Sequence, residues 1–132
     1  MKLVLANGCF DPLHPGHVEH LEAAATFGSR LIVALTVDEV VRYEKGERRP
    51  YLNWDERAMM LRALRCVDMV VRSDNAWSSI RRYRPEVFVK GSDWKDRMLG
   101  ETEKACAEVG ARLVYTETPR FGVGELVRRI TG

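Results

Sequence analysis

The chain has 132 residues, a length typical of one compact domain, and we expect residues 1–132 to form a single domain. Hydrophobic residues make up 45% of the chain and charged residues 30%, which excludes a wholly disordered protein. Lysine and arginine total 21 and aspartate and glutamate 19, so a formal charge of only +2 does not indicate a nucleic-acid or membrane surface. The longest apolar run, Leu31 to Leu35, is far below the ~18 residues of a membrane span. Three widely spaced cysteines favour a cytoplasmic location over a disulfide framework.

The first part of the chain predicts a strand, a loop, a helix and a second strand. Leu3 to Ala6 is a short apolar run that Asn7-Gly8 ends with a turn signal. The stretch from His17 to Phe27 then has apolar residues at helical spacing. Leu31 to Leu35 is a second apolar run of the kind that a buried parallel strand requires. Polar residues around Glu44 to Pro50 predict a long loop after it.

The rest of the chain continues this alternation. Asn53 is a predicted N-cap with Glu56 as its capping-box partner, at the start of a helix that carries Met59 to Leu64. Further strands are predicted at Met69–Val71, Val87–Val89 and Arg112–Tyr115, and further helices at Ala76–Tyr83, Glu101–Val109 and Leu126–Ile130. The pattern predicts an α/β fold, a Rossmann-like domain with a five-stranded parallel sheet flanked by helices. A ligand of such a sheet lies at the carboxyl ends of the strands, near the point where strand order reverses.

The loop after the first strand carries the clearest chemical signal. It reads Asn7-Gly8-Cys9-Phe10-Asp11-Pro12-Leu13-His14-Pro15-Gly16-His17 and leads into the first helix. Glycine lets the backbone approach a phosphate closely, and a helix N-terminus offers N–H groups and a positive dipole end. His14 and His17 fall on one side of the first helical turn. Together these features predict a polyphosphate site.

Two other interpretations of this loop are weaker. His14, His17 and His20 resemble a metal cluster, but the first and last diverge by about 120 degrees around a helix and no acidic fourth ligand is evident. We therefore expect no protein-bound metal, and we expect His20 to be structural or exposed. Cys9 beside two histidines resembles a nucleophile pair. A loop cysteine that is half-buried is the interpretation we prefer.

The motif Phe10-Asp11 followed by His14-Pro15-Gly16-His17 resembles the HxGH signature of the cytidylyltransferase-like nucleotidyltransferases. The resemblance extends over nearly the whole chain. Several segments are similar to the adenylyltransferase domain of bacterial ADP-heptose synthesis: Asn7–Asp11, Arg30–Leu35, Lys45-Gly46, Arg49-Pro50, Asp55–Arg57 and Val87–Trp94. The same segments, with Asp74–Trp77 and Thr118–Arg120, also resemble glycerol-3-phosphate cytidylyltransferase.

The resemblance implies an enzyme that transfers a nucleotidyl group. A phosphate oxygen of a phosphorylated sugar or polyol would attack the α-phosphorus of a nucleoside triphosphate and release pyrophosphate. That nucleophile is already anionic, so catalysis reduces to positioning and to stabilising charge. ATP is the leading donor, with CTP and glycerol phosphate as the alternative. Mg²⁺, bound mainly through the nucleotide phosphates, and a homodimer are further expectations.

The resemblance also implies roles for individual residues. His14 and His17 would hydrogen-bond the phosphates, and Lys45 and Arg120 would neutralise them. The nucleotide-binding residues would be Cys9, Phe10, Asp11, Gly16, Gly91, Asp93 and Gly122. Asp11 would orient the loop or help to hold Mg²⁺, and the acceptor would meet Arg57, Asp38 and Trp77. Plainer interpretations stay open: Lys45 and Arg57 as surface charges, Asp11 as a turn cap and Trp77 as a packing residue.

The last loop departs from the pattern of these families. They carry a Ser/Thr-rich motif before the closing helix, whereas this chain has Pro119-Arg120-Phe121-Gly122-Val123-Gly124-Glu125. Backbone N–H groups at the helix start can still bind phosphate. The missing hydroxyls leave a second class of function open, a nucleotide-binding module without turnover.

Overall fold

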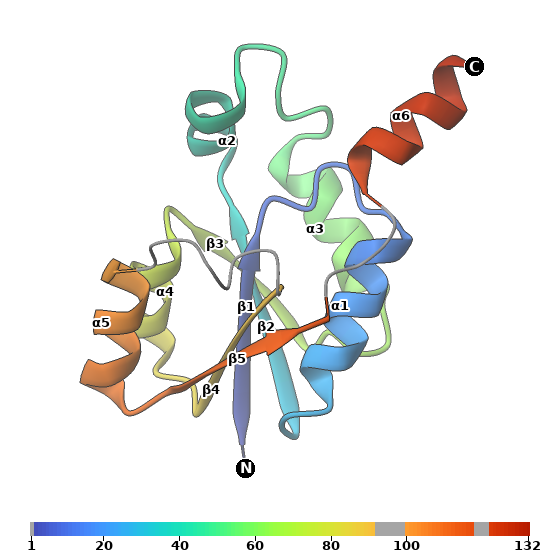
Figure 1. Ribbon diagram of the computed structural model, residues 1–132. Helices are drawn as coiled ribbons and strands as arrows, with labels where there is room; N and C mark the ends of the chain where they lie inside the picture. Colours follow the sequence, from blue (N-terminus) through green and yellow to red (C-terminus); the bar gives the residue numbers. More distant parts are fainter. Residues whose placement is uncertain (1, 92–99, 118–121) are drawn as a thin grey trace.

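The computed structural model describes residues 2–91, 100–117 and 122–132, apart from the side chain of residue 123. The strands are β1 (Leu3–Gly8), β2 (Arg30–Thr36), β3 (Met69–Ser73), β4 (Val87–Gly91) and β5 (Arg112–Thr116). The helices are α1 (Pro15–Ala25), α2 (Asp38–Lys45), α3 (Trp54–Arg62), α4 (Ala76–Tyr83), α5 (Gly100–Val109) and α6 (Val123–Thr131). The strands form one parallel sheet of order β3-β2-β1-β4-β5 (Figure 1). The predicted α/β fold is therefore confirmed.

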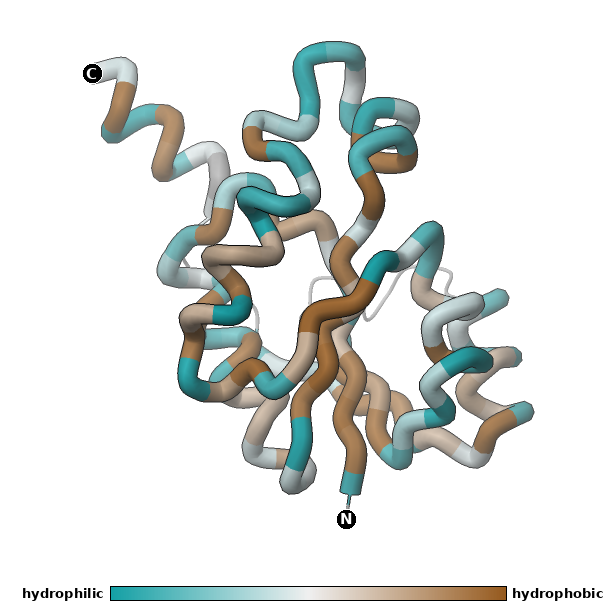
Figure 2. Tube along the Cα trace, turned by 180° about the vertical axis from the view of Figure 1, so that it is seen from behind, coloured by the Kyte–Doolittle hydropathy of each residue, from teal (hydrophilic) through white to brown (hydrophobic). Residues whose placement is uncertain are grey.

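Helices cover both faces of the sheet. Leu21 of α1 and Leu61 of α3 pack on one face against buried strand residues such as Val33. Ile80 of α4 and Cys106 of α5 pack on the other face. Successive strand residues point to opposite faces, so a strand covered on both sides needs a continuous apolar run. The central strands are accordingly hydrophobic along most of their length (Figure 2).

Strand order reverses beside β1. The chain passes from β1 through α1 to β2 on one side, while β4 pairs with the other side of β1. Gly91, at the end of β4, pairs in register with Thr116 at the end of β5. Along the chain α1 comes after β1 and α5 comes after β4, and these two helices cover opposite faces of the sheet. The carboxyl ends of β1 and β4 are where a ligand of this fold binds.

The helix α2 was not predicted from the sequence. Its eight residues include one fully buried apolar side chain, Val41, so the apolar periodicity is too weak to recognise. A second signal is present in its charges, because Asp38 and Glu39 occupy the first turn and Arg42 and Lys45 the last. Lys45 therefore ends a helix rather than lying in a long loop. Across the parts of the chain that the structure describes, no helix combines the length and apolarity needed to cross a membrane.

Candidate active site

His14 and His17 form the N-terminal cap of α1. His14 is the N-cap, and Pro15 occupies the first helical position. The N–H of His17 donates to Nδ1 of His14 at 3.4 Å, and the N–H of His14 donates to Nδ1 of His17 at 3.3 Å. Because each Nδ1 accepts from the backbone, each neutral ring carries its proton on Nε2. The capping box thus selects the tautomer whose Nε2–H can donate to an anion.

Burial keeps both rings in the neutral form. Their centroids are 3.6 Å apart and their planes lie 21° from parallel, a stacked arrangement. Burial lowers the pKa of His17 to about 3, and the charges of His14, His20 and Lys45 act in the same direction. Burial also lowers the pKa of His14. Both rings are therefore uncharged at neutral pH.

The turn before these histidines requires Gly8. Phe10 is buried with a φ of +46°, and its ring meets that of His17 edge-on at a centroid distance of 5.0 Å. A Cβ on Gly8 would lie only 3.0 Å from the Phe10 ring. A larger residue at position 8 would therefore displace the ring that packs against His17.

Asp11 binds protein groups through both of its carboxylate oxygens. Oδ2 accepts from Nε of Arg49 at 2.9 Å and from the N–H of Tyr51 at 2.7 Å, and Oδ1 accepts from the N–H of Leu52 at 3.0 Å. Asp11 is only 2% exposed. The expectation that it helps to hold Mg²⁺ gains no support from this arrangement, because its oxygens are enclosed and already bonded. Its alternative role, orienting the loop, is the one that this geometry supports.

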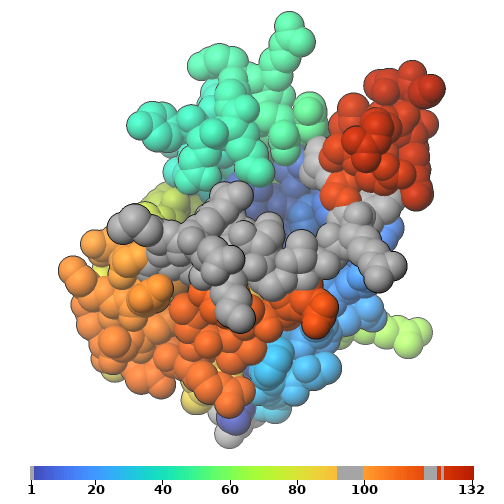
Figure 3. Space-filling model, viewed as in Figure 1, coloured from blue at the N-terminus to red at the C-terminus, as the bar shows by residue number. Residues whose placement is uncertain are grey.

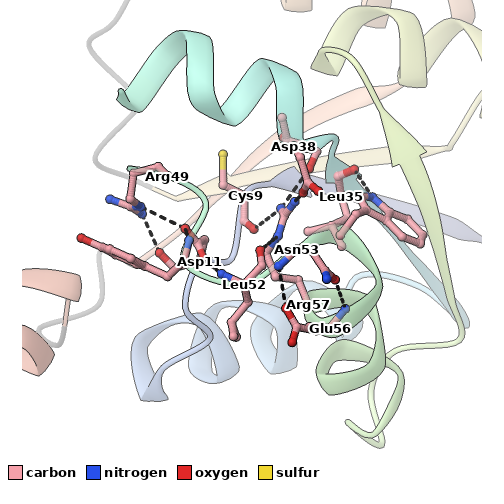
Figure 4. Close-up of polar contacts among 12 residues, drawn as sticks. Cys9, Asp11, Leu35, Asp38, Arg49, Leu52, Asn53, Glu56 and Arg57 are labelled. Atoms are coloured by element: carbon pink, nitrogen blue, oxygen red, sulfur yellow. Dashed lines mark hydrogen bonds and ion pairs between the residues drawn. The ribbon is translucent and has the colours of Figure 1, made fainter. Parts of the chain in front are cut away.

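Arg57 is placed differently from the expectation. Its side chain is fully buried and its Nη2 pairs with Oδ1 of Asp38. Its remaining contacts are with carbonyls: Nη1 donates to Cys9 and Thr36 and Nε donates to Leu52, each at 2.9 Å. Figure 4 shows the guanidinium at the centre of these groups. The expected contact of Arg57 with an acceptor phosphate gains no support from this geometry, because its buried guanidinium has four protein contacts and holds the first loop.

Together, Asp11, Arg49, Arg57 and Asp38 connect the first loop to α2, to α3 and to the segment between these helices. Arg49 reinforces the connection through Nη2, which donates to the carbonyl of Asp11 at 2.6 Å, and its guanidinium stacks on the ring of Tyr51. We call these four residues the loop anchor. Within the loop anchor, the carboxylate of Asp38 is paired with Arg57. An acceptor-binding role for Asp38 therefore stays a prediction.

The other predicted residues are spread around the carboxyl end of the sheet. Gly16 is buried in the first turn of α1, Cys9 is partly buried before Phe10, and Gly91 ends β4. Gly122 is the N-cap of α6, and Trp77, 37% exposed, lies on α4 across the sheet from α1. Asp93 and Arg120 lie outside the described residues. In Figure 3 the N-terminal part of the chain, in blue, is visible between α2 and α6. The ligand contacts of all these residues stay predictions.

Two cations were not predicted as site residues. Lys90 donates from Nζ to the carbonyl of Asn7 at 3.3 Å, which places its charge where β1 and β4 end side by side. Its position directly after the predicted strand Val87–Val89 was the available signal. Arg49 gave no comparable signal, because its partner Asp11 is 38 residues away in the sequence.

The sequence matches the cytidylyltransferase-like family over residues 5–120, which is most of its length. The chain belongs to the cytidylyltransferase-like family. It is 46% identical over 102 residues to the bifunctional protein HldE of Gluconobacter oxydans, covering 75% of this chain and 21% of that protein. It is 47% identical over 103 residues to HldE of Geotalea uraniireducens, covering 76% of this chain and 21% of that protein. The chain thus spans about a fifth of the length of these relatives.

Solved structures share the fold at lower identity. A lipopolysaccharide core biosynthesis protein from Thermoplasma volcanium superimposes with a TM-score of 0.74 at 22% identity, covering 92% of this chain and 99% of that chain. A pantoate-beta-alanine ligase from Francisella tularensis, complexed with beta-gamma ATP and beta-alanine, gives a TM-score of 0.67 at 13% identity. That match covers 93% of this chain and 61% of the ligase chain. At these identities the likeness supports the fold alone.

Proposed function

We propose that this chain is a nucleotidyltransferase that joins a nucleoside triphosphate to a phosphorylated sugar and releases pyrophosphate. The observation that carries the proposal is the stacked pair of neutral histidines at the N-terminus of α1. Neutral Nε2–H donors beside the N–H groups of a helix start suit a polyphosphate, and the pair follows β1 at the reversal of strand order. Similarity to HldE and to the adenylyltransferase domain of ADP-heptose synthesis favours ATP as donor and a heptose phosphate as acceptor.

The transfer requires no general base. An acceptor phosphate oxygen forms a bond to the α-phosphorus while the bond from that phosphorus to the bridging oxygen breaks, and pyrophosphate leaves with the electron pair. His14 and His17 would donate to the phosphate oxygens whose charge grows in the transition state. Lys45 lies close enough for its charge to affect the pKa of His17, which supports a role in neutralising the same phosphates. Arg120 would share this task.

Mg²⁺ would enter with the nucleotide and neutralise part of the phosphate charge. Within residues 2–91, 100–117 and 122–132, no group of three or more His, Cys, Asp or Glu side chains is arranged to hold a metal ion. No protein ligand is therefore assigned to Mg²⁺, and the roles of His14 and His17 do not depend on one.

Pyrophosphate release tests the proposal directly. ATP, CTP, GTP and UTP are each supplied with Mg²⁺ and with a heptose phosphate, its free sugar or glycerol phosphate, and His17→Ala serves as the blank. We expect turnover with ATP and the heptose phosphate and none with the free sugar, because a neutral hydroxyl would need a base. Turnover with CTP and glycerol phosphate would favour the cytidylyltransferase alternative. Nucleotide binding in calorimetry without pyrophosphate release would identify a binding module instead.

A cytoplasmic location and a homodimer stay proposals. The three cysteines, Cys9, Cys66 and Cys106, are free thiols, which supports a reducing compartment. Light scattering of the purified chain tests the dimer.

A further inference from the structure

A third histidine connects α1 to the edge strand of the sheet. His20 lies three residues after His17 on α1, and its Nδ1 is 2.7 Å from Oγ1 of Thr116, a hydrogen-bond distance. Thr116 is the last residue of β5 and is only 6% exposed. A buried hydroxyl at this distance from a ring nitrogen is a defined contact between two elements that are far apart in the sequence.

The contact lies at the level of the proposed active site. Thr116 pairs in register with Gly91, the end of β4, and β4 is the neighbour of β1. On the helix side, the charge of His20 is one of the causes that lower the pKa of His17. His20 is therefore close to His17 and bonded to the carboxyl end of β5.

The edge position of β5 makes this contact important. Among the strands that the structure describes, β5 has one neighbour, β4, so a single ladder holds its carboxyl end within the sheet. The His20 bond attaches that end to α1 as well. It thereby limits how far the carboxyl ends of β4 and β5 can move from the turn of α1 that carries His14 and His17.

We propose that His20 is a positioning residue for the nucleotidyl transfer. Through Thr116 it holds the strand ends at Gly91 at a set distance from His17, so a nucleotide that contacts both sides reacts from one geometry. This inference rests on the proposed function, because it assumes that the nucleotide spans Gly91 and His17. Small displacements of reacting groups slow transfer strongly, which is why a single bond outside the phosphate contacts affects the rate.

The test is a double-mutant cycle in the full chain. Thr116→Val removes the hydroxyl at nearly constant shape, and His20→Phe keeps a ring without a ring nitrogen. We expect each variant to lower kcat/KM for pyrophosphate release about five- to tenfold, the fold-change for loss of one hydrogen bond. The double variant should be no worse than either single variant, since both remove the same bond.

Matched variants separate positioning from general weakening. Thr116→Ser and His20→Asn keep a polar atom near the bond, and both should recover most of the rate. Thr102→Val in α5 removes another buried threonine hydroxyl, on the other face of the sheet, and should leave kcat/KM unchanged. All rates are measured well below each variant's unfolding temperature, so a loss of stability alone would not change them.

Wild-type turnover and nucleotide affinity, measured in parallel, separate this inference from the proposed function. If the wild type binds nucleotide without releasing pyrophosphate, the proposed function fails, and the same cycle is judged on the calorimetric Kd. The role of His20 is overturned if the effects of Thr116→Val and His20→Phe on kcat/KM or Kd add up in the double variant. It is also overturned if both single variants stay within twofold of wild type. A wild-type chain that binds no nucleotide overturns both.

Discussion

The loop after β1 and the helix α6 lie at the same end of the molecule, yet different interactions hold them (Figure 1). Asp11 of the loop and Arg57 of α3, which bonds to the loop, have no exposed side-chain surface, and both pair with an opposite charge. On α6, Glu125 pairs with Arg128 and Arg129, whose side chains are 73% and 65% exposed. The charged contacts of the loop connect it to residues that are far away in the sequence, whereas the ion pairs of α6 join residues of the same helix.

This difference predicts where substitutions will be costly. A buried charge that loses its partner stays desolvated and uncompensated, while an exposed charge that loses its partner is hydrated. The loop that carries His14 and His17 is therefore held in place before a ligand arrives. That arrangement suits phosphate transfer, in which the protein contributes mainly position and charge.

The largest effect is expected for Arg57→Met. The variant leaves Asp38 without its partner and removes the donor to the carbonyls of Cys9, Thr36 and Leu52. We expect the free energy of unfolding to fall by about 3 kcal/mol, because the carbonyls lose a buried donor, while Asp38, whose side chain is 32% exposed, stays partly hydrated. Urea denaturation measures it. Arg81→Met, which breaks the exposed pair with Glu108, is the matched control and should cause no resolvable change. Equal effects of the two variants would contradict the distinction between buried and exposed pairs.

The next effect concerns rate rather than stability. His17→Ala should lower the turnover of pyrophosphate release about a hundred- to a thousandfold, because it removes a donor to charge that grows in the transition state. Its effect on unfolding should be far smaller than that of Arg57→Met, since only one half of a capping box is lost. Glu19→Ala, at an exposed position on the same helix, is the control for both measurements. Near-wild-type turnover in His17→Ala would show that the phosphates are bound elsewhere.

A third effect follows from the pKa of His17, which burial lowers to about 3 in the folded protein. In the unfolded chain this imidazole has its ordinary pKa near 6.5. Between these values the unfolded state binds more protons, so stability is full above pH ~6.5 and is lost as the pH falls. From about pH 6.5 to 4.5, His17 should account for a loss of about 2 kcal/mol. Denaturation of wild type and His17→Ala at both pH values isolates this contribution, and parallel pH profiles would rule it out.

Local signals predicted the fold well. The capping box of Asn53 and Glu56 was predicted and is confirmed, and the predicted helix Ala76–Tyr83 matches α4 residue for residue. Both depend on residues that are close in the sequence. The five strands were found from their apolar runs, although each continues one or two residues further toward the site. The first helix begins at Pro15, two residues earlier than predicted, because His14 acts as its cap.

The loop anchor was beyond the reach of such signals. Arg57 meets Cys9 across 48 residues and Thr36 across 21, and Asp11 meets Arg49 across 38. An arginine on a short helix usually extends into solvent, so the sequence suggested either a phosphate ligand or a surface charge. Burial of its guanidinium depends on the paths of three loops at once. The contact between His20 and Thr116, across 96 residues, was missed for the same reason.

The smallest effect on stability is expected in α6, the second of the two regions compared, for Glu125→Gln. This substitution breaks the pairs with Arg128 and Arg129, both of which lie within one turn of the same exposed helix. Pairs of this kind gain little, because water screens them and both side chains lose rotamer freedom. We therefore expect urea midpoints of the variant and the wild type to coincide, and 1 M salt to leave any residual difference smaller still. A shift approaching that of Arg57→Met would show that α6 contributes to the core stability of the fold. The ion pairs of the loop and those of α6 would then contribute similarly to stability, contrary to the difference in their burial.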